Sequence, residues 1–378
     1  MSKNAPNILF IVKWFPHPGD RQFGVFTLKH AQCVAERVNL GVLHLCPMRV
    51  DHPRIVREEM GNVVVHRLEF PEYWNVFRKT SRLPASIREA LDQITSELGT
   101  PDLVHVHILG MPVLIARYHF PTTPLMISEH WTGFVNGYFA RMPIWKQRWF
   151  KTSTRKAFLT TVPSEHLRDV MINELGFPGR FETLPNVIDI PEQLTSTPPE
   201  RTQALVVADL HDHNKNISGL LRVWADVRPD ARLTIIGDGH DREQLEALSR
   251  ELELSIHEVE FLGRVDNREV FTHLANASFL IVNSRFETFS MITTEALGLG
   301  LPVLATRCGG PEQFVDTENG ILIPPDDPAQ LREALLRMLE THRNYDRPAI
   351  SRSFRTRYSS KAVGDRIMDL YNEALGKT

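Results

Sequence analysis

Residues 284–298 read SRFETFSMITTEALG, and this stretch is the strongest indication of the fold. It follows a short apolar run at 279–282 and leads into a segment with helical periodicity. Eight positions separate Glu287 from Glu295, a spacing that on one helix gives a rotation of about 80° and a rise of about 12 Å. We therefore expect Glu287 in the loop before the helix and Glu295 in its early turns.

Free backbone N–H groups of that first helical turn lie between the two acids. Such groups carry a partial positive charge and bind phosphates. The spacing therefore suits a ligand with a diphosphate in its middle and hydroxyls on both sides. A plainer alternative is an ordinary helix start with one solvated acid and one buried, ion-paired acid.

Short β-branched runs alternate with amphipathic stretches along the rest of the chain, which is typical of βαβ units and a parallel sheet. In the second half, strands are expected at 204–208, 233–236, 259–262, 279–282, 303–305 and 320–323, and helices at 217–225, 242–253, 268–275 and 293–299. In the first half, strands are expected at 8–12, 42–45, 63–68, 103–107 and 125–128, and helices at 26–37 and 87–98.

The length and a proline-rich break together predict two domains. At about 150 residues per domain, 378 residues favour two domains. Prolines interrupt the polar segment 185–199, which we expect to be the linker. We predict an α/β protein with doubly wound domains at 1–195 and 196–355. A last amphipathic helix within 356–378 is expected to cross back to the first domain.

Composition excludes several classes of protein. The net charge of −3 gives no signal for nucleic acid. Three cysteines are too few for a disulfide framework or a zinc site, which favours a reducing compartment. The apolar run at 8–12 is too short for a secretion signal, and the apolar segment 103–116 contains two histidines, a glycine and a proline. We expect a cytoplasmic protein.

Two familiar motifs are incomplete. Residues 236–239 (IGDG) resemble the start of a dinucleotide-binding turn, but Arg242 occupies the third glycine position, which disfavours an oxidoreductase. His105, His107 and His130 could form a metal trio. No carboxylate or cysteine stands at ligand spacing from them, so histidines that line a cleft are the preferred interpretation, and no metal is expected.

The pattern around Glu287-x7-Glu295, with ALGLGLPV at 296–303 and GGPE at 309–312, resembles the nucleotide-sugar site of family 4 retaining glycosyltransferases of the GT-B fold. Six further motifs follow in family order: PDLVHVH at 101–107, SEHWTGF at 128–134, LPNVID at 184–189, KNI at 215–217, IIGDG at 235–239 and FLGRV at 261–265. The resemblance implies two Rossmann-like domains facing across a cleft. The first would bind the acceptor and the second the nucleotide sugar.

The resemblance also implies a role for each site residue. Glu295 would bind the nucleotide ribose, Glu287 would bind hydroxyls of the transferred sugar, and Lys215 would neutralise the leaving diphosphate. His130 would touch the donor sugar, and His107 is a weaker candidate on the acceptor side. The implied catalytic set is His130, Lys215 and Glu287. The implied donor-binding set is Gly24, Gly237, Gly263, Arg264, Phe289, Ser290, Met291 and Glu295.

One position departs from the family pattern. Many members have an arginine where this chain has Asp209, and the segment from there to Lys215 is one residue longer. We read this as variation within the family, with Arg264, Arg285 or Arg307 as the candidate second phosphate cation.

The implied reaction moves a hexose-type sugar from a UDP- or GDP-linked donor to a glycan or lipid-linked acceptor, in cell-surface polysaccharide synthesis. It proceeds with retention of configuration and without a metal or other cofactor. Two alternatives remain: a catalytically inactive GT-B subunit that binds a nucleotide or a partner, and a sugar-nucleotide epimerase.

A basic segment at 141–156 suggests how the acceptor is reached. No acid occurs between Glu129 and Glu165, and two tryptophans, Trp145 and Trp149, lie four positions apart. Pro143 suits the first position of a helix. Such a helix is attracted to an anionic membrane surface, so we predict peripheral attachment to the inner leaflet of the cytoplasmic membrane. The alternative is that the tryptophans pack into the core. The six basic residues are Arg141, Lys146, Arg148, Lys151, Arg155 and Lys156.

Overall fold

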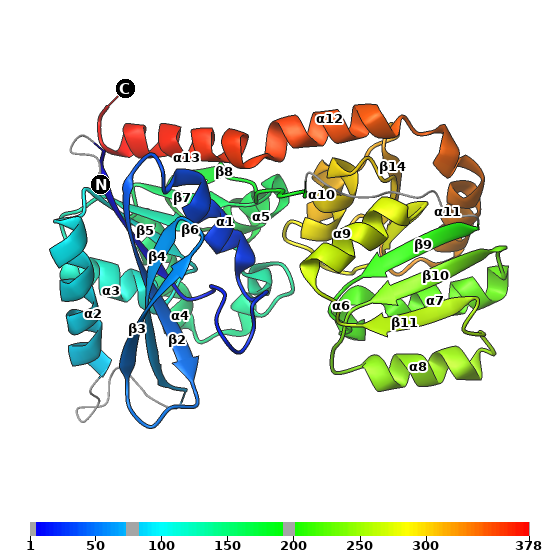
Figure 1. Cartoon of the computed structure of the whole chain (residues 1–378), viewed down its shortest axis with the longest axis horizontal. Helices are drawn as coiled ribbons and strands as arrows, with labels where there is room; N and C mark the ends of the chain where they lie inside the picture. The colour runs from blue at the N-terminus through cyan, green and yellow to red at the C-terminus, as the bar shows by residue number, and fades with distance from the viewer. Residues whose placement is uncertain (1–4, 73–82, 192–200, 378) are drawn as a thin grey trace. The chain divides into compact units, whose positions relative to one another are not determined.

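The computed structural model describes residues 5–72, 83–191 and 201–377 (Figure 1). The chain divides into two compact units, Met1–Val187 with Ser360–Thr378, and Ile188–Ser359. The first expected boundary, at 195/196, lies outside the described residues. The second, at 355/356, falls inside a helix, α12 (Arg347–Tyr358). The structure places that change of unit after the helix ends, at Ser359.

The first unit is built on an eight-stranded sheet in the order β3-β4-β2-β1-β5-β6-β7-β8. All neighbours are parallel except β3, which runs antiparallel to β4 at the edge. Without the edge strands β3 and β8, the order is that of a doubly wound Rossmann sheet, 3-2-1-4-5-6. The strands are β1 (Asn7–Val12), β2 (Asn39–Met48), β3 (Arg54–Met60), β4 (Val63–Pro71), β5 (Leu103–His107), β6 (Leu125–Ser128), β7 (Leu159–Val162) and β8 (Phe181–Thr183).

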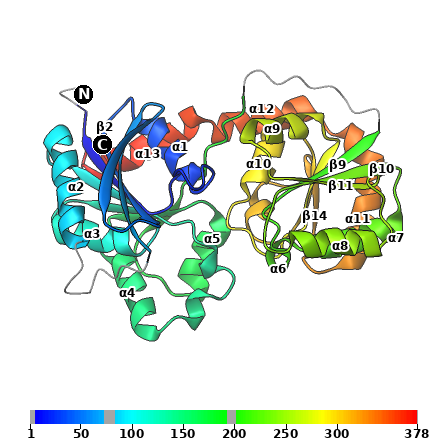
Figure 2. The ribbon, with the colours of Figure 1, turned by 60° about the horizontal axis from the view of Figure 1, so that its bottom comes forward.

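Helices cover both faces of this sheet (Figures 1 and 2). One core cluster contains side chains of α2 (Leu83–Leu98), α3 (Met111–His119) and α4 (Ile144–Arg155). The other contains side chains of α1 (Val25–Val34) and the last helix, α13 (Ser360–Ala374). The last helix therefore belongs to the first unit. The remaining helical pieces are α5 (Glu165–Asp169), a π-helical turn at Val170–Glu174 and single 3-10 turns at Thr132–Phe134 and Phe139–Arg141.

The second unit is a fully parallel six-stranded sheet in the order β11-β10-β9-β12-β13-β14. This is again the order 3-2-1-4-5-6, so both units have the predicted doubly wound Rossmann-like fold. The strands are β9 (Thr202–Val207), β10 (Ala231–Ile236), β11 (Val259–Gly263), β12 (Phe279–Val282), β13 (Val303–Thr306) and β14 (Gly320–Ile323). The helices are α6 (Asp212–Lys215), α7 (Ile217–Val227), α8 (Arg242–Glu251), α9 (Asn267–Asn276), α10 (Met291–Gly298), α11 (Pro328–Thr341) and α12, with 3-10 turns at Gly310–Gln313 and His342–Asn344.

The strand order of the second unit places its binding edge. The direction of winding reverses between β9 and β12, which are neighbours in the sheet. In doubly wound sheets, ligands bind outside the carboxyl ends of the strands at this reversal. The loops that follow β9 and β12 carry Lys215 and Glu287, so the fold brings the two predicted residues to one edge.

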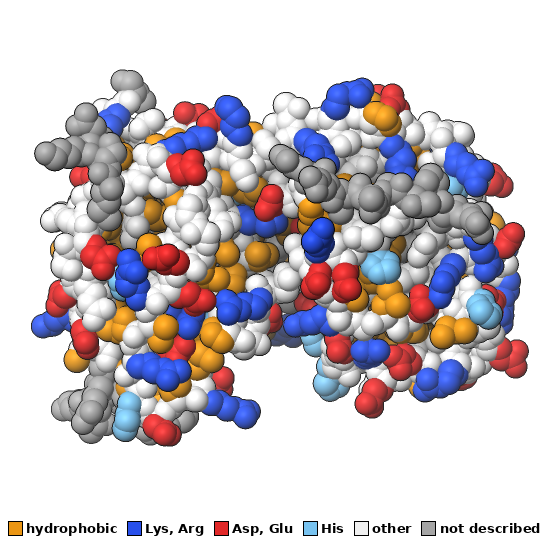
Figure 3. All heavy atoms as spheres, in the orientation of Figure 1, with side chains coloured by type: hydrophobic (Ala, Val, Ile, Leu, Met, Phe, Trp, Pro, Cys, Tyr) orange, Lys and Arg blue, Asp and Glu red, His pale blue; other side chains and the backbone are white. Residues whose placement is uncertain are grey.

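Within the described residues, no helix combines the length and the apolar composition that a bilayer crossing requires. On the face drawn in Figure 3, acidic and basic side chains are interspersed on each unit.

Candidate functional site

An ion pair joins the two loops at the reversal of the second sheet. Lys215 Nζ donates a hydrogen bond to Glu287 Oε1 at 2.5 Å, and Ser284 Oγ donates to the same oxygen at 2.9 Å. The two charged side chains are 23% and 15% exposed. Although burial acts to lower it, the pKa of Lys215 is raised above its usual value by the charge and hydrogen bond of Glu287. Lys215 is therefore a cation held in place at this edge of the sheet.

The loop that carries Lys215 is held in place from several sides. Asn216, directly after Lys215, has a left-handed backbone with φ 49°, which ends the short helix α6. Asp212 at the start of α6 accepts from the backbone N–H of Ser218 at 2.7 Å. Asn283, at the end of β12, donates to the carbonyl of Asn216 at 2.9 Å. The lysine therefore projects from a rigid turn.

Arg285 anchors the same loop, and its role was not predicted. Its guanidinium donates to the carbonyl of Asp212 at 2.8 Å and to Asn216 Oδ1 at 2.9 Å. It also pairs with Asp326 at 2.7 Å. Because its guanidinium is already engaged in these structural contacts, Arg285 is a poor candidate for the second phosphate cation.

The backbone around Glu287 is paired with the loop after β13. The N–H of Glu287 donates to the carbonyl of Cys308, and the N–H of Gly310 donates to the carbonyl of Glu287, both at 2.9 Å. A Cβ on Gly310 would lie 2.5 Å from backbone atoms of Phe289, so only glycine permits this approach. The position of Glu287 is therefore set by main-chain contacts.

Helix α10 begins at Met291, two residues before the start of the helix expected at 293–299. Ser290 precedes the helix with a left-handed φ of 68°, and its hydroxyl lies 2.7 Å from that of Thr293. The first turn, starting at Met291, contains no acidic side chain, so its N–H groups keep their attraction for an anion. Phe289 is buried before the helix, and Glu295 lies in its second turn at 8% exposure.

Backbone geometry explains two of the predicted glycines. A Cβ on Gly237 would lie 1.8 Å from the carbonyl oxygen of Ala208, and Gly237 has φ 139°. Gly263 has φ 76°, and a Cβ there would meet the guanidinium of Arg242 at 2.8 Å. Gly237 thus allows the carboxyl end of β10 to approach the loop after β9, and Gly263 supplies the left-handed backbone at the end of β11.

Asp209, which stands where many family members have an arginine, lies near an arginine from another loop. Arg264 Nη2 lies 3.8 Å from Asp209 Oδ1, with the side chains 57% and 71% exposed. The carboxylate that replaces the family arginine thus faces an arginine from the loop after β11. Arg264 remains the better candidate for a second cation at this edge; Arg307 is exposed in the loop after β13.

In the first unit, the predicted residues lie at the carboxyl ends of strands. Gly24 precedes α1 with φ 64°, where a Cβ would lie 2.2 Å from the backbone of Trp14. His107 ends β5, and His130 follows β6, with ring centroids 6.2 Å apart. Both histidines are buried, at 0% and 6% exposure. The structure therefore brings His107 and His130 together.

Glu129 positions His130, and we did not predict it. Its carboxylate accepts three backbone hydrogen bonds: from Leu109 at 2.7 Å, and from His130 and Trp131 at 2.8 Å. Burial raises the pKa of Glu129 to about 7, although these N–H donors favour the ionised form. A lone acid directly after the apolar strand 125–128 was the available signal.

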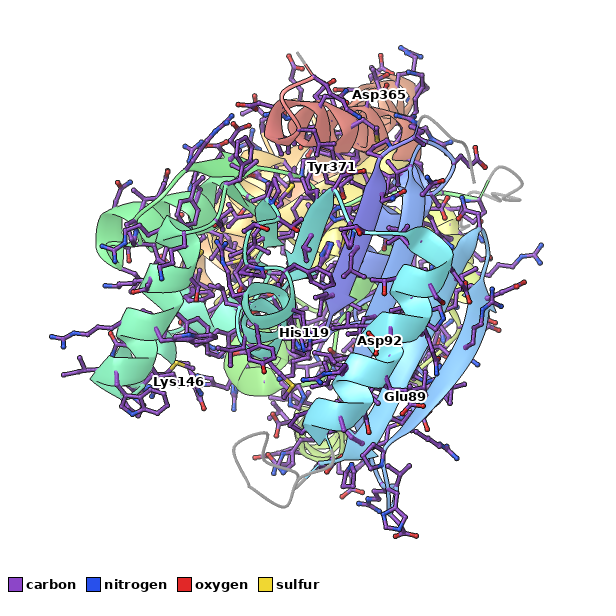
Figure 4. The ribbon with its side chains drawn as sticks, turned by 90° about the vertical axis from the view of Figure 1, so that its left-hand side faces the viewer. Glu89, Asp92, His119, Lys146, Asp365 and Tyr371 are labelled. Carbon is purple, nitrogen blue, oxygen red and sulfur yellow. The ribbon has the colours of Figure 1, made fainter. Side chains whose placement is uncertain are left out.

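His105 does not join the histidine trio that the sequence suggested. Its Nδ1 lies 2.7 Å from the hydroxyl of Tyr371, and its Nε2 lies 2.7 Å from Ser128 Oγ. Tyr371 comes from α13 and points toward the sheet (Figure 4). Both ring nitrogens of His105 are thus engaged. The third member of the trio is His30 from α1.

The two tryptophans of the basic segment have different environments. Helix α4 begins after Pro143, which is the residue before the helix and not its first residue. Trp145 is 71% exposed and its neighbour Ile144 67%. Trp149 packs against the core of the first unit. Trp149 thus packs into the core, as the alternative interpretation expected, whereas Trp145 lies on the surface.

A cavity of about 870 Å³ lies between α2 and α3, apart from the predicted site residues. Its wall includes Glu89, Asp92 and His119, which Figure 4 shows on the two helices. We assign it no role.

Solved structures with the same fold cover nearly the whole chain. Sucrose-phosphate synthase from Thermosynechococcus elongatus matches 98% of this chain and 100% of its own, with a TM-score of 0.80 and 17% identity. The apo form of the lipopolysaccharide outer core galactosyltransferase WaaB matches 98% and 99%, with a TM-score of 0.70 and 20% identity. At these identities the likeness shows the fold alone, and that fold is GT-B.

Two family models and several relatives then identify the family. The model described as Glycosyltransferase Family 4 matches residues 25–192, and the model described as Glycosyl transferases group 1 matches residues 201–341. The chain therefore belongs to the family 4, group 1 glycosyltransferases, as the motifs predicted.

Three relatives show what this chain is similar to. The lipopolysaccharide core biosynthesis glycosyltransferase LpsD of Rhizobium meliloti is 31% identical over 43% of this chain and 47% of its own length. An N-acetylgalactosaminyltransferase of Campylobacter jejuni, named for a diphospho-undecaprenol acceptor, is 31% identical over 46% and 48%. A GDP-mannose:cellobiosyl-diphosphopolyprenol alpha-mannosyltransferase of Xanthomonas oryzae is 25% identical over 79% and 80%. The chain spans about half the length of the first two.

Proposed function

We propose that this protein transfers a hexose-type sugar from a nucleotide diphosphate to a glycan or lipid-linked acceptor, with retention of configuration, in cell-surface polysaccharide synthesis. The observation that carries the proposal is the Lys215–Glu287 pair beside the first turn of α10, at the reversal of the second sheet. A fixed cation, a carboxylate and free N–H groups are the groups that a sugar diphosphate needs.

The chemistry follows from where charge develops. The bond between the sugar's anomeric carbon and the phosphate oxygen breaks, and negative charge accumulates on the departing diphosphate. Lys215 and the α10 N-terminus stabilise that charge more in the transition state than in the ground state. The acceptor oxygen then bonds to the anomeric carbon on the same face, and its proton passes to the departing phosphate.

Glu287 is placed to hold the sugar. Both of its side-chain contacts fall on Oε1, and no residue in the described part of the chain hydrogen-bonds Oε2. That oxygen is available to accept a sugar hydroxyl. Glu295, one turn into α10, would accept from the ribose. In this scheme Lys215 and α10 supply the positive charge, and no metal takes part.

The relatives' names support the choice of substrates. HepE of Anabaena, which shares the fold, has been solved with UDP and glucose. The Xanthomonas oryzae relative is named for GDP-mannose. Two relatives are named for acceptors on polyprenol diphosphates. We therefore propose a UDP- or GDP-linked donor and a lipid-linked acceptor.

A lipid-linked acceptor requires access to a membrane surface. Ile144 and Trp145 are exposed at the start of α4, and Arg148 and Arg155 are exposed farther along it. Exposed apolar side chains beside cations suit the interface of an anionic bilayer. We propose that α4 attaches the first unit to the inner leaflet of the cytoplasmic membrane.

The test begins with the donor. The purified chain is screened for thermal stabilisation by UDP-, GDP- and ADP-sugars, because a ligand that binds only the folded state raises its stability. The stabilising donor is then incubated with a polyprenyl-diphosphate sugar, and the products are identified by mass spectrometry. Glycosylated lipid supports the proposal. Nucleotide binding without product indicates an inactive subunit, and an isomerised nucleotide sugar indicates an epimerase.

A further inference from the structure

Three histidines of the first unit converge on one point in its interior. His30 comes from α1, His107 from the end of β5 and His130 from the loop after β6. One ring nitrogen from each lies within 4.8 Å of the others. All three side chains are buried, at 0%, 0% and 6% exposure.

Most of their ring nitrogens have no partner. His30 Nε2 lies 3.1 Å from the carbonyl oxygen of Pro185, which leaves Nδ1 as the free nitrogen. Both nitrogens of His107 and of His130 lack a hydrogen-bond partner among the residues that the structure describes. Buried polar atoms are normally satisfied, so five unpaired nitrogens in one place call for a ligand.

The adjacent His105 differs from the three in its hydrogen bonds, whereas His44, elsewhere in the same unit, also has two unpaired ring nitrogens. His105 lies in the same strand as His107, with ring centroids 4.4 Å apart. Nevertheless, both of its nitrogens are hydrogen-bonded, to Tyr371 and Ser128. The chain supplies partners to His105 and none to the three nitrogens that face one another.

The spacing of the three rings suits a metal ion. With a Zn–N distance of about 2.1 Å, each ring centroid lies about 3.2 Å from the ion, and tetrahedral imidazoles have centroids about 5.2 Å apart. The observed centroid distances are 5.9 Å for His30–His107, 6.0 Å for His30–His130 and 6.2 Å for His107–His130. A contraction of about 1 Å or less brings the rings to that geometry.

The protonation state is also the one that binds metal. Burial holds the pKa of His107 and of His130 well below the usual value and lowers that of His30 to about 4. Neutral imidazoles keep the lone pair that coordinates an ion.

We propose that His30, His107 and His130 form a binding site for one transition-metal ion of the Zn²⁺ type, with a fourth position open to a small ligand. Imidazole ligands favour Zn²⁺, Cu²⁺ or Ni²⁺ over Mg²⁺ and Ca²⁺, which prefer oxygen. Because the family resemblance implies that His130 touches the donor sugar, the bound ion inhibits transfer. This inhibitory role rests on the proposed function, whereas metal binding does not.

The binding test uses the full chain without a histidine tag. Titration with Co²⁺ is followed by visible absorption, and titration with Zn²⁺ by calorimetry. The expected result is one ion per chain, with the spectrum of a four- or five-coordinate cobalt site. X-ray absorption of the Zn²⁺ form should show scattering from three imidazoles. No saturable Co²⁺ spectrum, or one imidazole only, overturns the proposal.

Variants locate the site. His30→Gln and His107→Gln should each weaken Zn²⁺ binding by roughly 100-fold or more, since even groups that only support a metal ligand are worth 10–100-fold. His44→Gln is the matched control, because His44 is equally buried in the same unit but lies outside the trio. Circular dichroism in EDTA checks that each variant folds. Equal binding by wild type and both variants places the metal elsewhere and refutes the site.

Activity separates the two claims. Zn²⁺ should inhibit transfer by the wild type, and His30→Gln should keep transfer while losing that inhibition. One bound ion without inhibition supports the metal site and overturns its inhibitory role at His130. Co²⁺ binding requires no donor, so it stands even where the proposed transfer fails.

Discussion

Lys215 and Glu287 form a single charged unit at the binding edge of the second sheet. The pair is 2.5 Å apart and mostly buried. Removing one partner of a buried pair leaves the other charge uncompensated, which costs about 3–5 kcal/mol when burial is complete. Partial exposure reduces that cost. The two side chains therefore act together, and their substitutions should combine to less than the sum of their separate effects.

Lys215→Ala should slow sugar transfer by roughly 10²–10³, the scale for deleting one preorganised electrostatic donor. The measurement is kcat/KM with the donor found by thermal shift. Lys361→Ala is the matched control, since that lysine is 83% exposed on α13. Transfer near the wild-type rate in Lys215→Ala would mean that another cation, such as Arg264, holds the phosphates.

Substitutions of the two acids in residues 284–298 should affect different kinetic constants. Glu295→Ala should weaken nucleotide-sugar binding and raise KM. Glu287→Gln should mainly lower kcat, because its contact with the sugar strengthens as charge develops. Glu243→Ala, at an exposed position on α8, serves as the control. Unchanged kcat and KM in both site variants would contradict their assignment.

At this scale, the sequence predicted residues whose role depends on neighbours in the chain. The places of Glu287 before a helix and of Glu295 within it follow from local spacing, whereas Lys215 was reached through the family resemblance. The role of Arg285 could not be predicted, because its partners lie about 40 and 70 residues away. For the same reason His30 was missed: its distance from His107 is a product of the finished sheet.

At the scale of single elements, the prediction concerns the binding of helix α4 to an anionic membrane. Liposomes with anionic lipid should float with the wild-type protein at low salt, because each Lys or Arg near such a surface contributes about 1 kcal/mol. Charge reversal of Arg148, Lys151 and Arg155 to Glu, combined with Trp145→Ser, should abolish flotation. The matched control reverses Arg337 and Arg352, which are exposed on the second unit. Undiminished flotation of the α4 variant, or none by the wild type, would exclude attachment through α4.

Strands and helices were predictable where their apolar side chains are buried. The central strands of both sheets are continuous apolar runs, a pattern typical of parallel strands that are buried on both faces. Strand β3 was missed because it is an antiparallel edge strand, RIVREEM, with charged side chains and little burial. Its register against β4 comes from the hairpin between them and not from a hydrophobic pattern.

The stability of the whole molecule should depend on pH through His44. This residue is buried in β2, and burial, with the charges of Arg67 and His17, lowers its pKa to about 3. As the pH falls below about 6.5, the unfolded chain takes up a proton at His44 that the folded chain refuses, so folded stability is lost.

That linkage predicts a difference between wild type and His44→Gln. Between pH 6 and 4, the free energy of unfolding of the wild type should decrease as the pH is lowered. In His44→Gln this decrease should be smaller by about 1.4 kcal/mol per pH unit. Urea unfolding at several pH values measures the slope, and the region above pH 7, where neither chain titrates at this position, provides the control. Parallel curves would contradict the prediction, because they would show that His44 takes up its proton equally in the folded and the unfolded chain.

The return of α13 to the first unit has a consequence for synthesis on the ribosome. The first unit lacks part of its core until Val363, Ile367 and Tyr371 have been made. The second unit, which is continuous in sequence, is complete before those residues emerge. We therefore expect the second unit to fold before the first during synthesis. Until α13 has been made, the first unit should remain incompletely folded, with an apolar face that chaperones can bind.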